Sequence, residues 1–392
     1  MGFLAKGQYE NRHVFGSITF IAVIGFLVSL STAYVKTIWS VYIYSFVNSA
    51  AIVGLLTAFL TIVSLLSTFL FVPVVEKSNK ARLFLMSLIL FGISYILFAI
   101  NSNFYIFVII AFFSTIFGVL RLLSFGIIVR DKSKKSQISQ SEGLVYTFSN
   151  IAWVLGPLIA GFISENFGIR NVFVLASVFM FVSFFLFKFF NIQDSTISRT
   201  IHKNSAKNIA DYFKNFERTI IYFVGGGVTL WWAFIYTFIP IYIIQNNLAG
   251  IWVAYFLFAI PIPLILLEYK FSTAIRKTGF RKMFMVGFLF VSLMSFICFF
   301  ISNVYFVLLI LVLASIGMAM LEPTTEAYFF AVCNKEEEQR FYGIFSTRFD
   351  ANYFLATISS AVLLTFLPFK FMFILFGIFM LAMFLISMKI KK

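Results

Sequence analysis

Arg121, Glu322 and Glu326 stand inside long apolar runs of this chain, where a charge is costly and is therefore a functional candidate. Glu322 and Glu326 are four residues apart, a spacing that places both on one face of a helix. Arg121 lies ten residues before Asp131, or roughly 15 Å into its own helix at 1.5 Å per residue. A carboxylate in a low-dielectric cavity tends to hold its proton until water or a cation reaches it. The pattern therefore predicts proton transfer by Glu322 or Glu326.

Arg121 and Glu322 occupy similar places in the two halves of the chain. A shift of 200 residues places Arg121 at position 321, directly beside Glu322. We therefore expect both groups to face the pathway at similar depth, paired or bridged by substrate or water in some states. A fixed internal ion pair that anchors the cavity is the open alternative. Glu326 lies nearer the cytoplasm and is either part of the pathway or merely solvated.

Further pathway candidates lie in the first and seventh apolar runs. Lys36 is either a cavity cation or a side chain that snorkels to the outer surface. Trp231, Trp232 and Tyr236 could stack on flat or cationic solutes, or could pack against lipid or neighbouring helices.

Other charged residues are expected to act in gating. Glu268, Arg348 and Asp350 lie in later apolar runs, where we expect gating ion pairs or ion pairs between the two halves, with Asp350 as a reserve proton carrier. Cys298 and Cys333 form neither a disulfide framework nor a metal-ligand pattern. No nucleotide-binding, zinc or catalytic motif appears in the sequence, so we expect no enzyme activity, no metal and no cofactor.

Composition indicates that lipid is the solvent of this chain. Of its 392 residues, 61% are hydrophobic and only 11% are charged, whereas soluble domains are near half apolar and a quarter charged. The net charge of +15 comes from Lys and Arg clustered between apolar runs. The positive-inside rule explains such loops better than nucleic-acid binding does, so a lipid bilayer is the expected partner and nucleic acid is not.

The apolar runs predict an all-α membrane protein of twelve transmembrane helices, because about 20 apolar residues span a bilayer. The runs are residues 14–39, 51–71, 83–100, 104–128, 143–164, 171–190, 219–243, 250–267, 283–301, 304–329, 342–366 and 370–388. Basic residues concentrate in the even-numbered connections, which places both termini in the cytoplasm of a multi-pass protein of the cell membrane. Residues 191–218 form a cytoplasmic linker, either a flexible one or one with an amphipathic helix on the inner membrane face.

An internal repeat at an offset of 200 residues divides the chain into an N-terminal bundle, 1–190, and a C-terminal bundle, 219–392. Ser102–Tyr105 matches Ser302–Tyr305, and Tyr42–Ile43 matches Tyr242–Ile243. Six helices per half make the copies parallel, so we expect two six-helix bundles related by a pseudo-twofold axis along the membrane normal.

The loop after the second helix carries an acid and two bases, Glu76, Lys77 and Lys80, and its second copy keeps Lys277 and Arg281. This loop resembles the Gly-x-x-x-Asp-(Arg/Lys)-x-Gly-(Arg/Lys)-(Arg/Lys) pattern of the major facilitator superfamily of secondary transporters, although both glycines are lost in the first copy. The basic turn could pair with acids or helix ends across the two halves; setting the topology is the alternative role.

The fifth helix resembles the pattern Gly-x8-Gly-x3-Gly-Pro-x2-Gly-Gly that is associated with exporters of this superfamily. Every spacing is kept in Gly143, Ala152, Gly156–Pro157, Ala160 and Gly161, with two Gly replaced by Ala. Small residues allow close helix approach and Pro allows bending, so the helix suits a seam between moving halves; ordinary Gly-mediated packing is the alternative.

The resemblance implies a secondary active transporter, and the fifth helix favours the drug/proton antiporter-like branch. We therefore expect efflux of a small organic or amphipathic solute by proton-coupled alternating access, by a protein that is a monomer. One alternative is an uptake symporter or uniporter for a small solute, for example an anion attracted by Lys36 and Arg121. Another is a lipid flippase or non-transporting receptor on the same fold.

Overall fold

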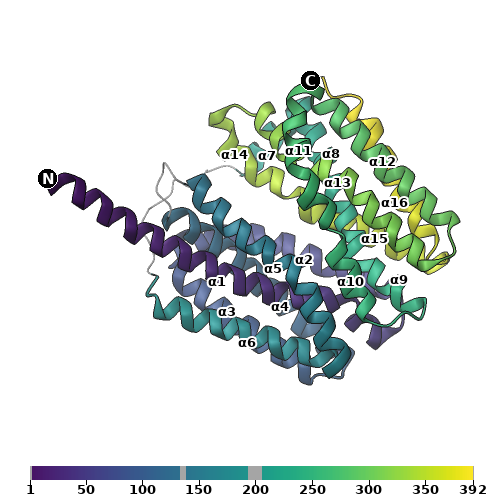
Figure 1. Ribbon diagram of the computed structural model, residues 1–392, viewed down its shortest axis with the longest axis horizontal. Coiled ribbons are helices and arrows are strands. Elements are labelled where there is room, and N and C mark those ends of the chain that lie inside the picture. Colours follow the sequence, from purple (N-terminus) through teal and green to yellow (C-terminus); the bar gives the residue numbers. More distant parts are fainter. Residues whose placement is uncertain (1, 133–137, 193–204, 392) are drawn as a thin grey trace. The chain divides into compact units, whose positions relative to one another are not determined.

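The structure, a computed structural model, describes residues 2–132, 138–192 and 205–391. Every element of this described part is a helix (Figure 1). The elements are α1 (Gly2–Val47), α2 (Ala50–Lys77), α3 (Lys80–Ile100), α4 (Phe104–Lys132), α5 (Ile138–Phe167), α6 (Ile169–Phe189), α7 (Ser205–Lys214), α8 (Phe216–Ala233), the π-helical turn η1 (Phe234–Phe238), α9 (Ile239–Gln245), α10 (Ile251–Ala259), α11 (Ile262–Thr278), α12 (Phe280–Phe300), α13 (Val304–Val332), α14 (Lys335–Ser346), α15 (Arg348–Phe366) and α16 (Phe371–Ser387).

The twelve predicted membrane-spanning helices are confirmed. Within the described residues, eleven helical stretches are long and apolar enough to cross a membrane, and α16 is a shorter apolar helix. The seventh span, Phe216–Gln245, consists of α8, η1 and α9, and the eighth, Ile251–Thr278, consists of α10 and α11. The chain is therefore an all-helical, multi-pass membrane protein.

The chain divides into two compact units that differ slightly from the predicted bundles. Unit 1 comprises residues 1–42 and 63–201, and unit 2 comprises residues 43–62 and 202–392. The end of α1 and the first half of α2 thus group with unit 2, although the repeat assigned them to the N-terminal bundle. In that segment, a Cβ placed on Gly54 would lie 3.0 Å from the Cβ of Ala361.

The repeat predicted from the sequence recurs in the internal contacts of each unit. Tyr42 stacks edge-on against Phe173 in unit 1, and Tyr242 does the same against Phe373 in unit 2. All four positions obey the offset of 200 residues.

A serine–glycine contact repeats with its two roles exchanged. Ser177 donates a hydrogen bond to the carbonyl of Gly92 in unit 1 at 2.8 Å, and Ser292 donates to the carbonyl of Gly377 in unit 2 at 2.8 Å. The same pair of positions therefore joins α3 to α6 and α12 to α16, with the donor on opposite helices. Equivalent helices thus pack against each other through equivalent residues in the two units.

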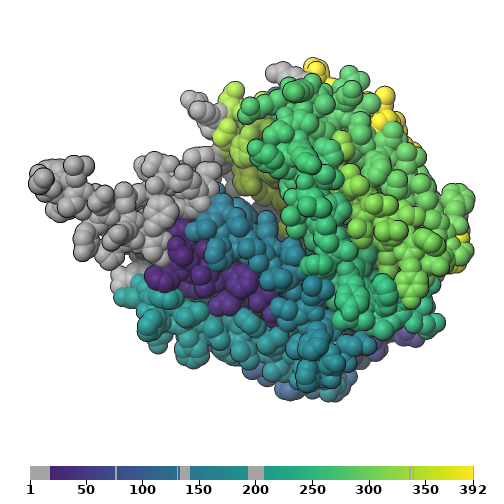
Figure 2. Space-filling view, in the orientation of Figure 1, coloured from purple at the N-terminus to yellow at the C-terminus, as the bar shows by residue number. Residues whose placement is uncertain are grey.

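In unit 1, α1 lies between α5 and α6 (Figure 2, purple). Ser31 of α1 donates a hydrogen bond to the carbonyl of Ala176 in α6 at 2.6 Å. On the other side, Gly156 of α5 lies against Ala33 so closely that an added Cβ would be 2.5 Å from the Cβ of Ala33. This contact explains why α5 carries a small residue there.

The predicted amphipathic helix of the linker exists as α7, and it docks onto α14 of the same unit. Residues 193–204 of the predicted linker lie outside the described part of the chain. Tyr212 is fully buried, with its ring 5.6 Å from that of Phe341 in α14. Asp211 forms ion pairs with Lys214 and Arg340. Protein thus covers Tyr212, whereas Ile209 and Phe213 on the same helix remain exposed, so the position of α7 on the inner membrane face stays a prediction.

Protonation of Asp211 should weaken the docking of α7 on α14. Hydrogen bonds from Lys214 and Arg340 hold the pKa of the Asp211 carboxyl below its usual range. Its stabilising contribution is therefore present above the unfolded pKa of about 3.9 and is lost as the pH falls through the lower folded value. Asp211→Asn should mimic this loss at neutral pH and speed tryptic cleavage after Lys214, as measured by mass spectrometry. Asp131→Asn is the control, and equal cleavage rates in the two variants would contradict the docking.

Two glycines of α5 should respond oppositely to a single added methyl group. Gly156→Ala places the new Cβ against Ala33 and should destabilise the protein by about 1–3 kcal/mol through overpacking. At Gly143 an added Cβ meets nothing within 4 Å, so Gly143→Ala should be neutral or gain up to about 1 kcal/mol of helix propensity. Thermal unfolding in detergent measures both variants. Equal melting temperatures would show that the α1–α5 contact is not tight.

Candidate functional site

Glu322 is held by an indole from the neighbouring helix α8 in unit 2. The Nε1–H of Trp232 donates a hydrogen bond to the Glu322 carboxylate. Glu268 of α11 lies close enough to interact electrostatically with Glu322, and the Tyr236 ring centroid is 5.6 Å from that of Trp232. The structure thus gathers Glu322, Trp232, Tyr236 and Glu268, four predicted site residues from three different spans, into one cluster.

The π-helical turn η1 carries one side of this cluster. Tyr236 and Thr237 both lie in η1, and the Thr237 hydroxyl is hydrogen-bonded to the hydroxyl of Tyr353 in α15 at 2.9 Å. π-Helical turns are rare and are often found at functional sites. Sequence periodicity carried no signal for this turn, and Tyr353 was not predicted.

Arg348 forms an ion pair with Glu326 inside unit 2. The Arg348 side chain is only 2% exposed, whereas that of Glu326 is 41% exposed. The guanidinium carbon lies 3.5 Å from the Phe345 ring centroid and 4.2 Å from that of Phe349. The acid that pairs with Arg348 is therefore Glu326 of α13, which belongs to the same unit. The predicted ion pair between Arg348 and the other half of the chain is not required to balance its charge.

Three consecutive glycines of α8 make room for side chains of neighbouring helices. A Cβ on Gly225 would lie 3.1 Å from the Nε of Arg348, and one on Gly226 would lie 2.1 Å from the Nδ2 of Asn352. On Gly227 the nearest atom would be a ring carbon of Phe288, at 2.7 Å. The triplet is therefore a packing feature that admits Arg348 and Asn352 to the backbone of α8.

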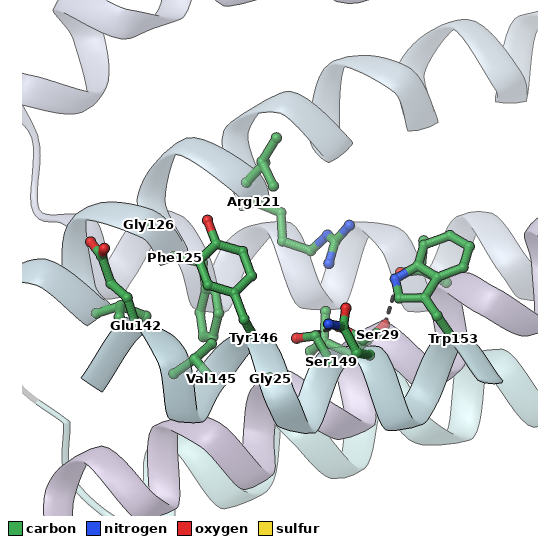
Figure 3. A pocket seen from close by; sticks show the side chains of 15 residues that line it. Gly25, Ser29, Arg121, Phe125, Gly126, Glu142, Val145, Tyr146, Ser149 and Trp153 are labelled. Carbon is green, nitrogen blue, oxygen red and sulfur yellow. Dashed lines mark hydrogen bonds between the residues drawn. The ribbon is translucent and has the colours of Figure 1, made fainter. Parts of the chain in front are cut away.

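Arg121 lies in a separate cavity within unit 1, between α1, α4 and α5. The cavity has a volume of about 410 Å³. The Arg121 guanidinium points into it above Ser149 (Figure 3), and its Nε is buried without a hydrogen-bond partner among the described residues. The Phe91 ring centroid lies 5.2 Å from the guanidinium carbon. Arg121 thus faces a hollow, while its pairing with Glu322 of the other unit stays a prediction.

Several lining residues of this cavity were not predicted. Ser29 and Ser149 are hydrogen-bonded to each other at 3.1 Å, and Trp153 lies one turn beyond Ser149 on α5. One sequence feature could have indicated them: Ser149 and Trp153 are four residues apart, which places both on the same face of α5.

The remaining pathway candidates occupy different environments. Trp231 is fully buried against Phe234 in the core of unit 2, which agrees with its alternative role in packing. Lys36 is partly buried in α1, and Asp350 is partly buried in α15. Their predicted roles stay predictions.

The predicted gating residues of the loop after α2 and of its second copy after α11 lie at corresponding helix ends. Lys77, Lys277 and Arg281 are exposed, Lys80 is partly exposed, and the Glu76 side chain lies outside the described part. Gly279 ends α11 with φ +77°, a conformation that favours glycine. Of the α5 pattern, Gly156, Pro157 and Gly161 are buried and Gly143 is exposed. Their roles in gating and at the seam stay predictions.

Comparison with known proteins gives the same family in several ways. A family model described as Major Facilitator Superfamily matches residues 21–267 and 271–391. An uncharacterised MFS-type transporter of Methanocaldococcus jannaschii is 19% identical over 276 residues, covering 69% of this chain and 70% of the relative.

Solved structures share the fold at low sequence identity. A POT family transporter in complex with 5-aminolevulinic acid has a TM-score of 0.76 at 15% identity, covering 96% of this chain and 97% of its own. The nucleoside transporter NupG has a TM-score of 0.77 at 11% identity, covering 95% of this chain and 99% of its own.

The Glu326–Arg348 pair should behave as a coupled unit in stability measurements. Glu326→Gln leaves the buried guanidinium without its acid and should destabilise the protein by about 1–3 kcal/mol, less than for a fully buried pair because Glu326 is 41% exposed. Arg348→Met added to Glu326→Gln should restore part of that loss. Thermal unfolding of both single variants and the double variant measures the coupling, with exposed Glu165→Gln as the control. Strict additivity would refute the pair.

Proposed function

The chain belongs to the major facilitator superfamily, and from this premise we propose that it exports a small organic or amphipathic solute by proton-coupled alternating access. Membership makes it a membrane transporter with a lipid bilayer around it and a small-molecule substrate. Three parts of this function are our proposal: the direction of transport, the coupling to protons, and the location in the cell membrane with both termini in the cytoplasm.

Proton coupling is supported by the position of Glu322. An ionisable residue in a membrane-spanning helix is a functional candidate because the apolar surroundings penalise its charge. Trp232 is a donor only, so its indole orients the Glu322 carboxyl in either protonation state. Glu268 of α11 interacts electrostatically with Glu322, so the cluster contains a second acid that could carry a proton. The arrangement can take up one proton and release it when access changes.

Export is supported by the pattern in α5. Gly156 and Pro157 are buried in the helix that the resemblance places at the moving seam. Gly156 admits α1 to close contact, and Pro157 leaves a backbone carbonyl of α5 without its helical partner. Both features allow α5 to bend while it stays packed.

Uptake of an anionic solute is a second candidate function. It is favoured by Arg121, whose guanidinium faces the cavity of unit 1. A symporter moves the proton and the solute in the same direction, whereas an antiporter moves them in opposite directions.

Glu322→Gln should abolish the link between proton flux and solute flux. A glutamine keeps the hydrogen bond from Trp232 but cannot carry a proton. Purified protein in liposomes that contain a pH-sensitive dye, with a solute chosen by thermal stabilisation, reports proton movement when that solute is added. Wild type should move protons against the solute, and Glu322→Gln should exchange solute across the membrane without proton flux.

Exposed Glu165→Gln serves as the matched control and should retain coupling. Undiminished proton flux in Glu322→Gln would remove this residue from the scheme. Proton and solute flux in the same direction would replace export by the symport alternative.

A further inference from the structure

The cavity of unit 1 holds a cation that the described chain does not neutralise. No carboxylate among the described residues forms an ion pair with Arg121, and its Nε is buried without an acceptor. Glu142 also lines the cavity, but it lies at the far end of the view, beyond Tyr146 (Figure 3). A charge removed from water without a partner is strongly unfavourable, so the site favours an anion from outside the chain.

The corresponding place in unit 2 contains its own acids. The contact between helices beside each of these regions recurs at the offset of 200 residues. Gly25 lies against Phe125 in unit 1, and Gly225 lies against Thr325 in unit 2. The comparison of the two places is therefore made at equivalent positions.

At these equivalent positions the charges differ. Leu122 and Gly126 of unit 1 correspond to Glu322 and Glu326 of unit 2, while Arg121 corresponds to a leucine. Both acids of unit 2 are satisfied from within the chain, Glu322 by an indole N–H and Glu326 by a guanidinium. Unit 2 thus contains both its acids and the groups that donate to them. Unit 1 contains the donor Arg121 without an acid paired to it among the described residues.

The cavity walls specify what kind of anion fits. The planar guanidinium of Arg121 matches the two oxygens of a carboxylate. The Ser29 hydroxyl donates to that of Ser149, which leaves the Ser149 hydroxyl as a donor in the cavity. Phe125 and Trp153 also line the cavity and offer aromatic faces. One cation balances one negative charge, which favours a monoanion over a phosphate dianion. The volume of about 410 Å³ suits a small solute.

We propose that this cavity binds the carboxylate of a small organic acid against Arg121, with the apolar or aromatic body of the acid between Phe125 and Trp153. The inference rests on the proposed transport function, because it names the class of solute that the transporter carries. Glu322 remains the proton carrier, and Arg121 is the group that touches the solute.

Matched acids and amides test the charge requirement on the wild-type protein. The probes are 3-phenylpropanoate, benzoate and hexanoate, each beside its neutral primary amide, measured by thermal stabilisation and by equilibrium dialysis of purified protein without any gradient. At least one carboxylate should bind and raise the melting temperature, and its amide should bind about ten- to hundredfold more weakly. Binding of no carboxylate, or equal binding of acid and amide, overturns the proposal.

Variants locate the binding group. Arg121→Gln should weaken carboxylate binding about ten- to hundredfold. Arg121→Lys should retain part of the binding, because the positive charge stays but the two parallel N–H donors of the guanidinium are lost. Arg170→Gln, an exposed arginine of the same unit, is the matched control and should bind as wild type does. Unchanged binding in Arg121→Gln overturns the assignment, and the wild-type comparison decides the matter if that variant does not fold.

The outcome is separable from that of the proposed function. Binding is measured at equilibrium and does not depend on Glu322, so loss of proton coupling leaves the carboxylate result intact. Conversely, coupled transport of a neutral or cationic solute, with no carboxylate bound, would keep the proposed function and reject this inference.

Discussion

Every polar group inside this protein has to be satisfied without help from the lipid around it. Many hydroxyls of the spans meet this demand locally, as when Thr57 and Thr61 donate to the carbonyls four residues before them. Charges cannot be satisfied in this way. Three of the described charges are accommodated differently: an indole contacts Glu322, a guanidinium pairs with Glu326, and a cavity lies beside Arg121. In the first two, the charged group has its partner within unit 2. In the third, the Nε of Arg121 has no hydrogen-bond partner among the described residues.

The internal repeat gives these arrangements a common frame. The aromatic contact of Tyr42 with Phe173 and its copy show that the backbones of the two units place equivalent residues alike. Residues that differ at equivalent positions are therefore candidates for the roles that differ between the two units. The acids concentrated in α13 and the cation in α4 are such a difference, and they divide proton handling and solute recognition between the units in the scheme proposed above.

The spans and the repeat could be predicted from the sequence because both depend on the length and spacing of apolar runs. The partners of charged residues could not, since they depend on the rotation of each helix about its axis. Adjacent residues differ by about 100° in direction, so Trp232 reaches Glu322 while Trp231 points into the core. The docking of Tyr212 on α14 likewise joins segments that an amphipathic pattern alone cannot relate.

The glycine triplet of α8 brings several neighbouring helices onto the bare backbone of one short stretch. Gly225, Gly226 and Gly227 point in directions about 100° apart, which together span somewhat more than half a turn. A Cβ on them would meet Thr325 of α13, Asn352 of α15 and Phe288 of α12, in that order, within 3 Å. This stretch of α8 can therefore turn about its own axis only if side chains of α12, α13 and α15 move with it.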